Sequence, residues 1–296
     1  MYSTLEIFLV PIHYTVRTTS VVMVHVSDKL LPLLPLRILN SVYWAFFGSS
    51  LAIFALQFIY RYLTISMNKM IKTFYSWKIV LWLLIPIVNG IIWGLMGICL
   101  CRPTKESTEY LRPYVLKDFK TDIDEFDYLG GLMYLKLNDG SFKFYFNTLL
   151  TITVMSVIVS FSFVVIIFCG SKCYLMISEM NAITSSSACS QKLQSQLFYA
   201  LVFQTLIPVL LLHFPISVMF GFVLTDHGLG IYSSIVSITI SLYPAIDPLP
   251  NFFIISPYRK AAFRCIKRVH PMTDNSINQA PPNSKNVAAP AINNTV

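Results

Sequence analysis

The chain has 296 residues, of which 55% are hydrophobic and only 12% are charged. A mean hydropathy of +0.63 is far too high for a water-soluble domain of this length. The formal net charge is +8, but the basic residues lie between apolar runs rather than along one face. That pattern follows the positive-inside rule of membrane proteins and argues against a nucleic-acid-binding surface. The composition therefore predicts an integral membrane protein in contact with lipid.

Five apolar runs are long enough to cross the hydrocarbon core, which takes about 20 residues. They cover residues 38–60, 79–101, 145–169, 197–225 and 231–255. The first four contain no Asp, Glu, Lys or Arg, and the fifth contains only Asp247. A sixth candidate, residues 7–26, is interrupted by Pro11, His13 and Arg17, so it is a poor span, an interfacial helix or part of a damaged helix. The predicted fold class is all-α, a polytopic transmembrane helix bundle.

Charges in the connections predict the orientation. The link after the first run carries Arg61, Lys69, Lys72 and Lys78 with no acidic residue, which predicts a cytoplasmic position. The connection 102–143 has seven basic and eight acidic residues, a net charge of −1, and is predicted to be extracellular. Basic residues again follow the last run. We therefore expect a membrane bundle over residues 1–268 and a disordered cytoplasmic tail over residues 269–296.

Asp247 lies in a proline-rich part of the last run, close to Pro244, Pro248 and Pro250. A carboxylate inside a bilayer is costly, so it usually has a partner or a function. Each proline lacks a backbone donor, so the helix must bend, and the freed carbonyls need other partners. Asp247 is thus either a switch residue or a partner for backbone groups at the bend, and the two interpretations are compatible.

Two further polar features lie at predicted inner ends of spans. Arg61 stands between Tyr60 and Tyr62, where it either anchors the helix at the interface or turns back into the bundle. The run from 191 to 204 places Gln194 and Lys192 at the start of another span. This end of the helix could move outward to admit a G protein, although ordinary hydrogen bonding between helices explains its glutamines equally well.

The sequence shows no motif that indicates an enzyme. The five histidines show no metal-ligand spacing, and the sequence has no nucleophile motif and no glycine-rich phosphate loop. We therefore predict no enzyme activity, no cofactor and no metal site. Cys265, just past Arg264, is a candidate for palmitoylation on a short membrane-surface helix, or an unmodified cysteine.

Three segments resemble the nematode serpentine chemoreceptors, and the Str group in particular. They are SLAIFALQFIYRY at 50–62, QKLQSQLFYALVFQTLIP at 191–208 and LYPAIDPLP at 242–250 with Tyr258 and Arg259. They occur in the family's order, each at the inner half of a different span, and the match covers most of the chain. Family members begin with an additional span, and residues 2–13 look like the end of the family's second helix. The expectation is a shortened bundle without the first family helix.

The resemblance implies a G-protein-coupled chemoreceptor that senses a small odorant or soluble chemical outside the cell and signals to a heterotrimeric G protein inside. It also implies residence in the plasma membrane of sensory-neuron cilia. By analogy with rhodopsin-like receptors, the resemblance implies that a set of residues couples to the G protein or acts as a switch. The set is Tyr60, Arg61, Tyr62, Lys192, Tyr243, Asp247 and Pro248.

We expect the ligand pocket in the outer halves of the spans, where aromatic and methionine side chains supply soft apolar surface. The candidates are Tyr43, Trp44, Phe47, Met219, Phe220, Phe222 and Tyr232, which could equally face lipid. Two alternative functions remain. A non-signalling, truncated receptor variant would keep the same motifs. A transporter or channel would be expected to show a continuous polar path or repeat symmetry.

Overall fold

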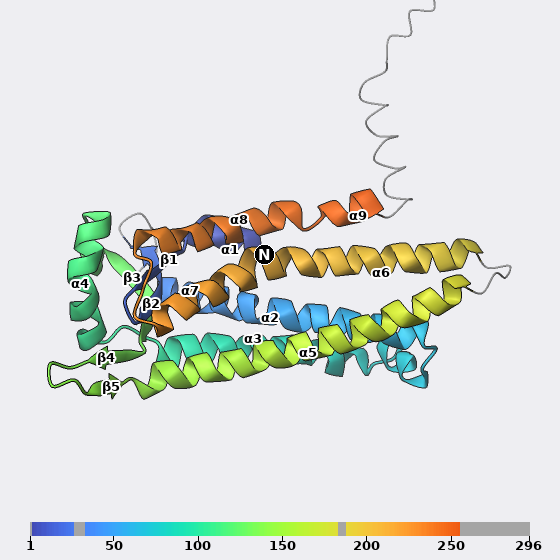
Figure 1. Cartoon of the computed structure of the whole chain (residues 1–296), viewed down its shortest axis with the longest axis horizontal. Coiled ribbons are helices and arrows are strands. Elements are labelled where there is room, and N and C mark those ends of the chain that lie inside the picture. Colours follow the sequence, from blue (N-terminus) through green and yellow to red (C-terminus); the bar gives the residue numbers. More distant parts are fainter. Residues whose placement is uncertain (1, 27–32, 183–187, 255–296) are drawn as a thin grey trace, which may run out of the picture.

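A computed structural model describes residues 2–26, 33–182 and 188–254. The helices run along one long axis, with a β-sheet and a short crossing helix at one end and the ends of α5 and α6 at the other (Figure 1). The long elements are α2 (Leu33–Ile65), α3 (Ile79–Leu95), α5 (Phe146–Ala182) and α6 (Ala188–Pro208). They are followed by α7 (Phe214–Leu224), α8 (Ile235–Ile246) and α9 (Leu249–Ile254).

Four helical segments are long and apolar enough to cross a membrane: Pro35–Ile65, Ile79–Leu100, Phe146–Met180 and Lys192–Leu224. They coincide with the first four predicted runs. Two of them include a π-helical turn, Met96–Leu100 after α3 and Val209–His213 between α6 and α7. Large apolar side chains on the outer faces are exposed, such as Val157, Phe161 and Val164 of α5. Such faces are stable only against lipid or another apolar surface.

The fifth predicted run is interrupted. A 3₁₀ turn (Ile231–Ser234) leads into α8, which contains Pro244 and ends at Ile246. Asp247 and Pro248 form a turn before α9 begins at Leu249. The break lies where the prolines predicted a bend, because their missing donors interrupt the helical hydrogen-bond ladder.

The sixth candidate span, residues 7–26, is not a helix, and that expectation was wrong. Helix α1 (Tyr2–Leu9) is followed by strands β1 (Ile12–Val16) and β2 (Thr19–His25). The strands pair antiparallel, with Val16 opposite Thr19, and Arg17 has a φ of 49° in the connecting turn. Valine and threonine are frequent here, and β-branched residues fit a pleated surface better than a helix.

The predicted outer connection folds into a cap rather than an open loop. It contains α4 (Lys105–Phe119), a 3₁₀ turn (Ile123–Glu125), β3 (Phe126–Leu132), β4 (Tyr134–Lys136) and β5 (Phe142–Phe144). Strand β3 pairs antiparallel with β2, so the first sheet has the order β1-β2-β3 and joins segments about a hundred residues apart. At the start of α4, Thr104 and Ser107 form a capping box.

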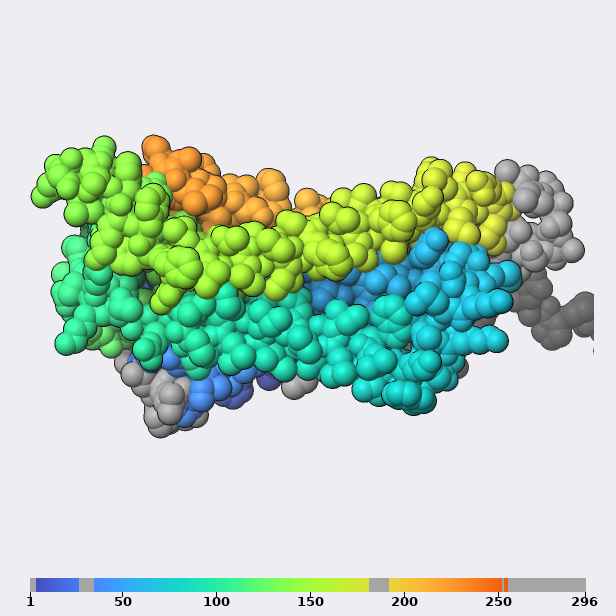
Figure 2. Space-filling model, turned by 90° about the horizontal axis from the view of Figure 1, so that it is seen from below, coloured from blue at the N-terminus to red at the C-terminus, as the bar shows by residue number. Residues whose placement is uncertain are grey.

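Helix α2 is the centre of the bundle and packs against both α3 and α5; Figure 2 shows it recessed between them. Small residues allow the close approach to α3: a Cβ atom on Gly48 would overlap the Trp93 ring. Polar groups add hydrogen bonds across the same interface. Ser41 Oγ donates to Gly94 O at 2.8 Å, and Asn89 Nδ2 donates to Gly48 O at 2.9 Å.

Candidate functional site

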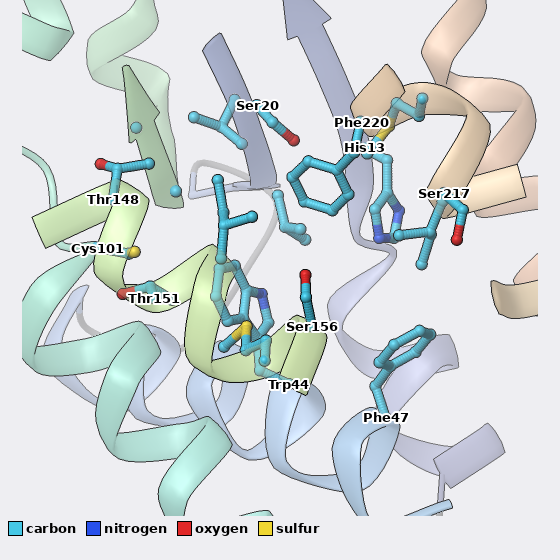
Figure 3. A pocket seen from close by; sticks show the side chains of 18 of the residues that line it. His13, Ser20, Trp44, Phe47, Cys101, Thr148, Thr151, Ser156, Ser217 and Phe220 are labelled. Atoms are coloured by element: carbon cyan, nitrogen blue, oxygen red, sulfur yellow. The ribbon is translucent and has the colours of Figure 1, made fainter. Parts of the chain in front are cut away.

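A cavity of about 380 Å³ lies inside the bundle, directly beneath the sheet β1-β2-β3, which is called the outer sheet because the connection that contains β3 is predicted to be extracellular (Figure 3). Helices α2, α3, α5 and α7 form its walls, together with the π-helical turn before α7, and strands β2 and β3 close its outer end. Its lining is mostly apolar, with a few polar side chains such as Thr148, Thr151 and Ser156. A mainly apolar pocket with a small number of polar groups is typical of small-molecule sites, and this volume is at the small end of their range.

Five of the seven predicted pocket residues line this cavity: Tyr43, Trp44 and Phe47 of α2, and Met219 and Phe220 of α7. Phe222 and Tyr232 are not among its lining residues. Phe222 is 42% exposed, since it lies about 200° around the helix from Phe220. Tyr232 is 73% exposed in the 3₁₀ turn that precedes α8.

Several lining residues were not predicted from the sequence. His13 comes from β1, Trp93 from α3, Met155 and Ser156 from α5, and His213 from the π-helical turn. His213 carried a usable signal, because it is a polar side chain in an otherwise apolar run beside Pro208. His13 carried none, because its position depends on a hairpin that the sequence pattern did not indicate.

The polar atoms of the cavity are only partly paired. Trp44 Nε1, Trp93 Nε1 and His213 Nε2 are buried and have no hydrogen-bond partner among the described residues. A buried polar group without a partner costs about 1–3 kcal/mol, so these side chains are a polar element in an otherwise apolar region of the bundle. In Figure 3 the side chains of Trp44 and Ser156 point into the same space from neighbouring helices.

The outer sheet is tied to the bundle by buried hydrogen bonds. The backbone N–H of His13 donates to Ser237 Oγ, and that of Thr15 to Ser233 Oγ, both at 2.9 Å. His13 is 4% exposed, and burial lowers the pKa of its imidazole to about 4. The cap and the last span therefore hold each other in place above the cavity.

An ion pair with a buried carboxylate and a half-buried arginine joins the cap to α2. Arg37 Nη2 lies 2.6 Å from Asp127 Oδ1 on β3, and Asp127 is 1% exposed. The pKa of Asp127 is raised from its ordinary value, because the cost of burying the carboxylate exceeds the stabilisation by Arg37. The second carboxylate oxygen, Oδ2, is buried without a hydrogen-bond partner among the described residues.

The predicted coupling residues lie at the opposite end of the bundle. Arg61 Nη1 donates to Gln194 Oε1 at 2.8 Å, which connects the ends of α2 and α6 that lie away from the sheet, the predicted inner ends. Tyr60 turns away from this contact, with its hydroxyl 3.0 Å from that of Tyr75. Tyr62 packs against the apolar cluster between α2 and α5, and Lys192 is exposed.

Asp247 and Pro248 form the break between α8 and α9, and Tyr243 packs against the apolar core one turn earlier. Asp247 Oδ1 is buried without a hydrogen-bond partner among the described residues. Among the described residues, Arg61 and Asp247 form no hydrogen bond or ion pair with each other, so the two predicted switch residues lie at separate sites.

Cys265, Tyr258, Arg259 and the tail lie outside the described residues. Within 2–26, 33–182 and 188–254, no group of three or more His, Cys, Asp or Glu side chains could hold a metal ion.

Membrane-length apolar helices with a ligand-sized cavity beneath a sheet at one end are typical of a helical membrane receptor. The comparison with protein families agrees. The sequence matches the profile of the serpentine type 7TM GPCR chemoreceptor Str family over residues 1–263, and the chain belongs to this family. It is therefore an integral membrane protein of a receptor family rather than of an enzyme family.

The chain is also similar to individual nematode proteins. It is 32% identical to the "G-protein coupled receptor str-217" of Caenorhabditis elegans over 229 residues, which cover 77% of this chain and 65% of that protein. It is 30% identical to the "Serpentine receptor class r-10" of the same species over 77% of this chain and 66% of the relative. The chain thus spans just under two thirds of the length of these relatives. No solved structure matches the chain.

Proposed function

We propose that this protein is a chemoreceptor that binds a small molecule in the cavity beneath the outer sheet and activates a heterotrimeric G protein at the end that carries Arg61. One observation supports this most directly: α2 and the continuous run from α6 to α7 contribute to both ends. Phe47 and His213 line the cavity, whereas Arg61 and Gln194 of the same two segments meet at the basic end. A change in the cavity can therefore move both partners of the inner contact.

The distances suit transmission through rigid helices. Phe47 and Arg61 are fourteen positions apart on α2, about 21 Å at 1.5 Å per residue. Gln194 and His213 are nineteen positions apart, about 28 Å along a segment that contains the π-helical turn. Such turns are frequent at functional sites because they allow the two parts of a helix to shift relative to each other.

The membrane orientation and the cellular site complete the proposal. The acidic cap would face outside, and Lys69, Lys72, Lys78 and Lys192 would face the cytoplasm, as the positive-inside rule requires. The plasma membrane of sensory-neuron cilia is where such a receptor would meet external chemicals. Lys192 and Arg61 would belong to the surface that meets the G protein, with Tyr243, Asp247 and Pro248 as a bend that responds to the ligand.

A cell assay tests this proposal. The full chain is expressed with a G-protein dissociation reporter and exposed to panels of volatile and soluble small molecules. Ser156→Trp should fill the cavity and abolish every response, and Arg61→Ala should abolish signalling at unchanged surface expression. Tyr232→Phe, outside the cavity, is the matched control and should respond normally.

Three outcomes would contradict the proposal in different ways. A response that survives Ser156→Trp would place the ligand elsewhere. Ligand binding without any G-protein response would favour the non-signalling alternative. Ligand-dependent solute or ion flux without G-protein dissociation would favour a transporter or channel.

A further inference from the structure

The connection between α2 and α3 presents exposed cationic and apolar side chains next to each other. It contains a 3₁₀ helix, Lys69–Tyr75, and ends at Lys78, the residue before α3. We propose that this connection, residues 66–78, and the first turns of α3 together bind an anionic phospholipid. The proposal does not depend on the signalling function, since none of these residues lines the cavity.

The positive charge of the connection is unopposed. Lys69, Lys72 and Lys78 are all exposed, and none of them forms an ion pair with a carboxylate among the described residues. The sequence contains no Asp or Glu between Asp28 and Glu106. Lysines grouped at the end of a membrane helix attract the anionic headgroups of the adjacent leaflet. Charge complementarity therefore indicates a ligand with negative charge.

The 3₁₀ helix turns two of these lysines outward. Residues three apart lie on one edge of such a helix, so Lys69, Lys72 and Tyr75 form a row, and all three are exposed. Another edge is held against the bundle, because the Phe74 ring stacks on that of Trp82 with their centroids 4.7 Å apart. The row of lysines therefore points in a fixed direction, away from the helices.

The apolar side chains favour a lipid over a soluble phosphate compound or an acidic protein. Met67 and Trp77 flank the 3₁₀ helix and are 89% and 75% exposed. Trp77 leads directly into α3, whose first turn exposes Ile79, Val80 and Leu81. Tryptophan is enriched where a membrane meets water, and the apolar face of α3 suits an acyl chain. A phospholipid would match both parts, with its headgroup at the lysines and a chain along α3.

Lipid binding to the purified full chain tests this proposal. The protein in neutral detergent micelles is titrated with phosphatidylserine and with phosphatidylcholine, and bound lipid is counted by native mass spectrometry. Each lysine near anionic headgroups contributes about fivefold in affinity, so phosphatidylserine should bind at least about tenfold more tightly than phosphatidylcholine. Raising the ionic strength from about 0.1 M to about 1 M shortens the Debye length from about 10 Å to about 3 Å and should remove most of this preference.

Two variants separate charge from apolar contact. Lys69→Gln with Lys72→Gln should weaken phosphatidylserine by roughly twentyfold and leave phosphatidylcholine unchanged. Trp77→Gln should weaken both lipids by a similar factor, because its ring contacts any lipid. Lys105→Gln with Lys117→Gln is the matched control. These two exposed lysines lie on α4 in the cap, so their removal should change the binding of neither lipid.

The proposal is overturned if phosphatidylserine binds no more tightly than phosphatidylcholine to the unmodified protein, a comparison that needs no variant to fold. It is also overturned if the cap control loses the preference as strongly as Lys69→Gln with Lys72→Gln, because net charge alone would then determine binding. Equal affinity for glycerophosphoserine, the headgroup without acyl chains, would mean that the site takes a soluble phosphate compound. Lysine variants that keep the lipid preference but lose G-protein activation would show that this surface contacts the G protein instead.

Discussion

The two ends of the molecule are held together in different ways. At the outer end, a three-stranded sheet, the ion pair of Arg37 with the buried Asp127 and hydrogen bonds to Ser233 and Ser237 join the cap to α2 and α8. At the other end, Arg61 of α2 donates to Gln194 of α6, beside an apolar cluster that includes Phe58, Ile177 and Phe198. Buried polar networks resist opening, whereas a partly exposed hydrogen bond such as that of Arg61 contributes about 1 kcal/mol.

This difference fits the proposed function. A ligand site needs fixed walls, because a loosely held cavity would lose affinity to ordering costs. A coupling surface needs a contact that a modest binding energy can break, since a ligand shifts an equilibrium only by its differential affinity for the two states. The outer cap therefore suits recognition, and the inner ends of the helices suit movement.

The largest expected loss of folding stability comes from removing the Arg37 side chain. Arg37→Met leaves Asp127 as a buried carboxylate without its partner, and breaking such a pair costs about 3–5 kcal/mol. Because Asp127 already has a raised pKa, the loss should shrink as the pH falls and the carboxyl becomes protonated. We expect a lower thermal unfolding midpoint of the purified protein at pH 7 and a smaller difference near pH 4.

Arg112→Met is the matched control. Arg112 contacts Asp122 and Asp124 on the cap, but these carboxylate side chains are 43% and 69% exposed and stay solvated without it, so its removal should leave the unfolding midpoint unchanged. The double variant Arg37→Met with Asp127→Asn should recover much of the lost stability. Equal losses in Arg37→Met and Arg112→Met would show that burial of the first pair is not what stabilises the cap.

The second expected effect is a loss of folding stability at low pH, which arises from His13 in the cap. The folded state keeps His13 neutral with a pKa of about 4, whereas the unfolded chain binds a proton near pH 6.5. The unfolded state thus binds more protons between these values, so stability should fall as the pH drops from 6.5 to 4. The full cost is roughly 3 kcal/mol, at 1.36 kcal/mol per pKa unit.

His13→Asn tests this expectation. It should flatten the pH dependence of the unfolding free energy between pH 6.5 and 4, measured by chemical denaturation. His227→Asn, at an exposed histidine, should leave the dependence as it is in the unmodified protein. A slope that stays the same in His13→Asn would mean that the imidazole is protonated inside the folded cap.

Much of the bundle could be predicted from the sequence, because membrane spans are long apolar runs and their length is set by the bilayer. Four of the five predicted runs are membrane-length helices, and the prolines near Asp247 predicted a bend in the fifth, where the helix is interrupted. The cap was not. Its sheet depends on pairing between Thr19 and Leu132, more than a hundred residues apart, and no local period encodes such pairing. The apolar character of residues 12–25 reflects burial in that sheet.

In the candidate site, too, some residues could be predicted from the sequence and others could not. Aromatic residues on α2 were predicted to lie in the pocket from their place in a span, and the structure puts Tyr43, Trp44 and Phe47 there. Phe222 was assigned to it by composition alone, although its side of α7 faces away. Trp93 and His213 were missed because only three-dimensional packing places them in the lining of the cavity.

The smallest expected change in free energy comes from removing the hydrogen bond between Arg61 and Gln194, yet this change should be visible in signalling. Gln194→Ala removes the acceptor of Arg61 at a cost of about 1 kcal/mol. If the contact favours the inactive arrangement, that loss shifts the population of the active one by about fivefold, so basal G-protein activation should rise by up to that factor. Gln204→Ala, further along the same helix and outside this contact, should leave basal activity unchanged. Basal activity that is the same in both variants at equal surface expression would mean that the contact between α2 and α6 does not restrain the receptor. The outer cap would then have to be searched for the restraint instead.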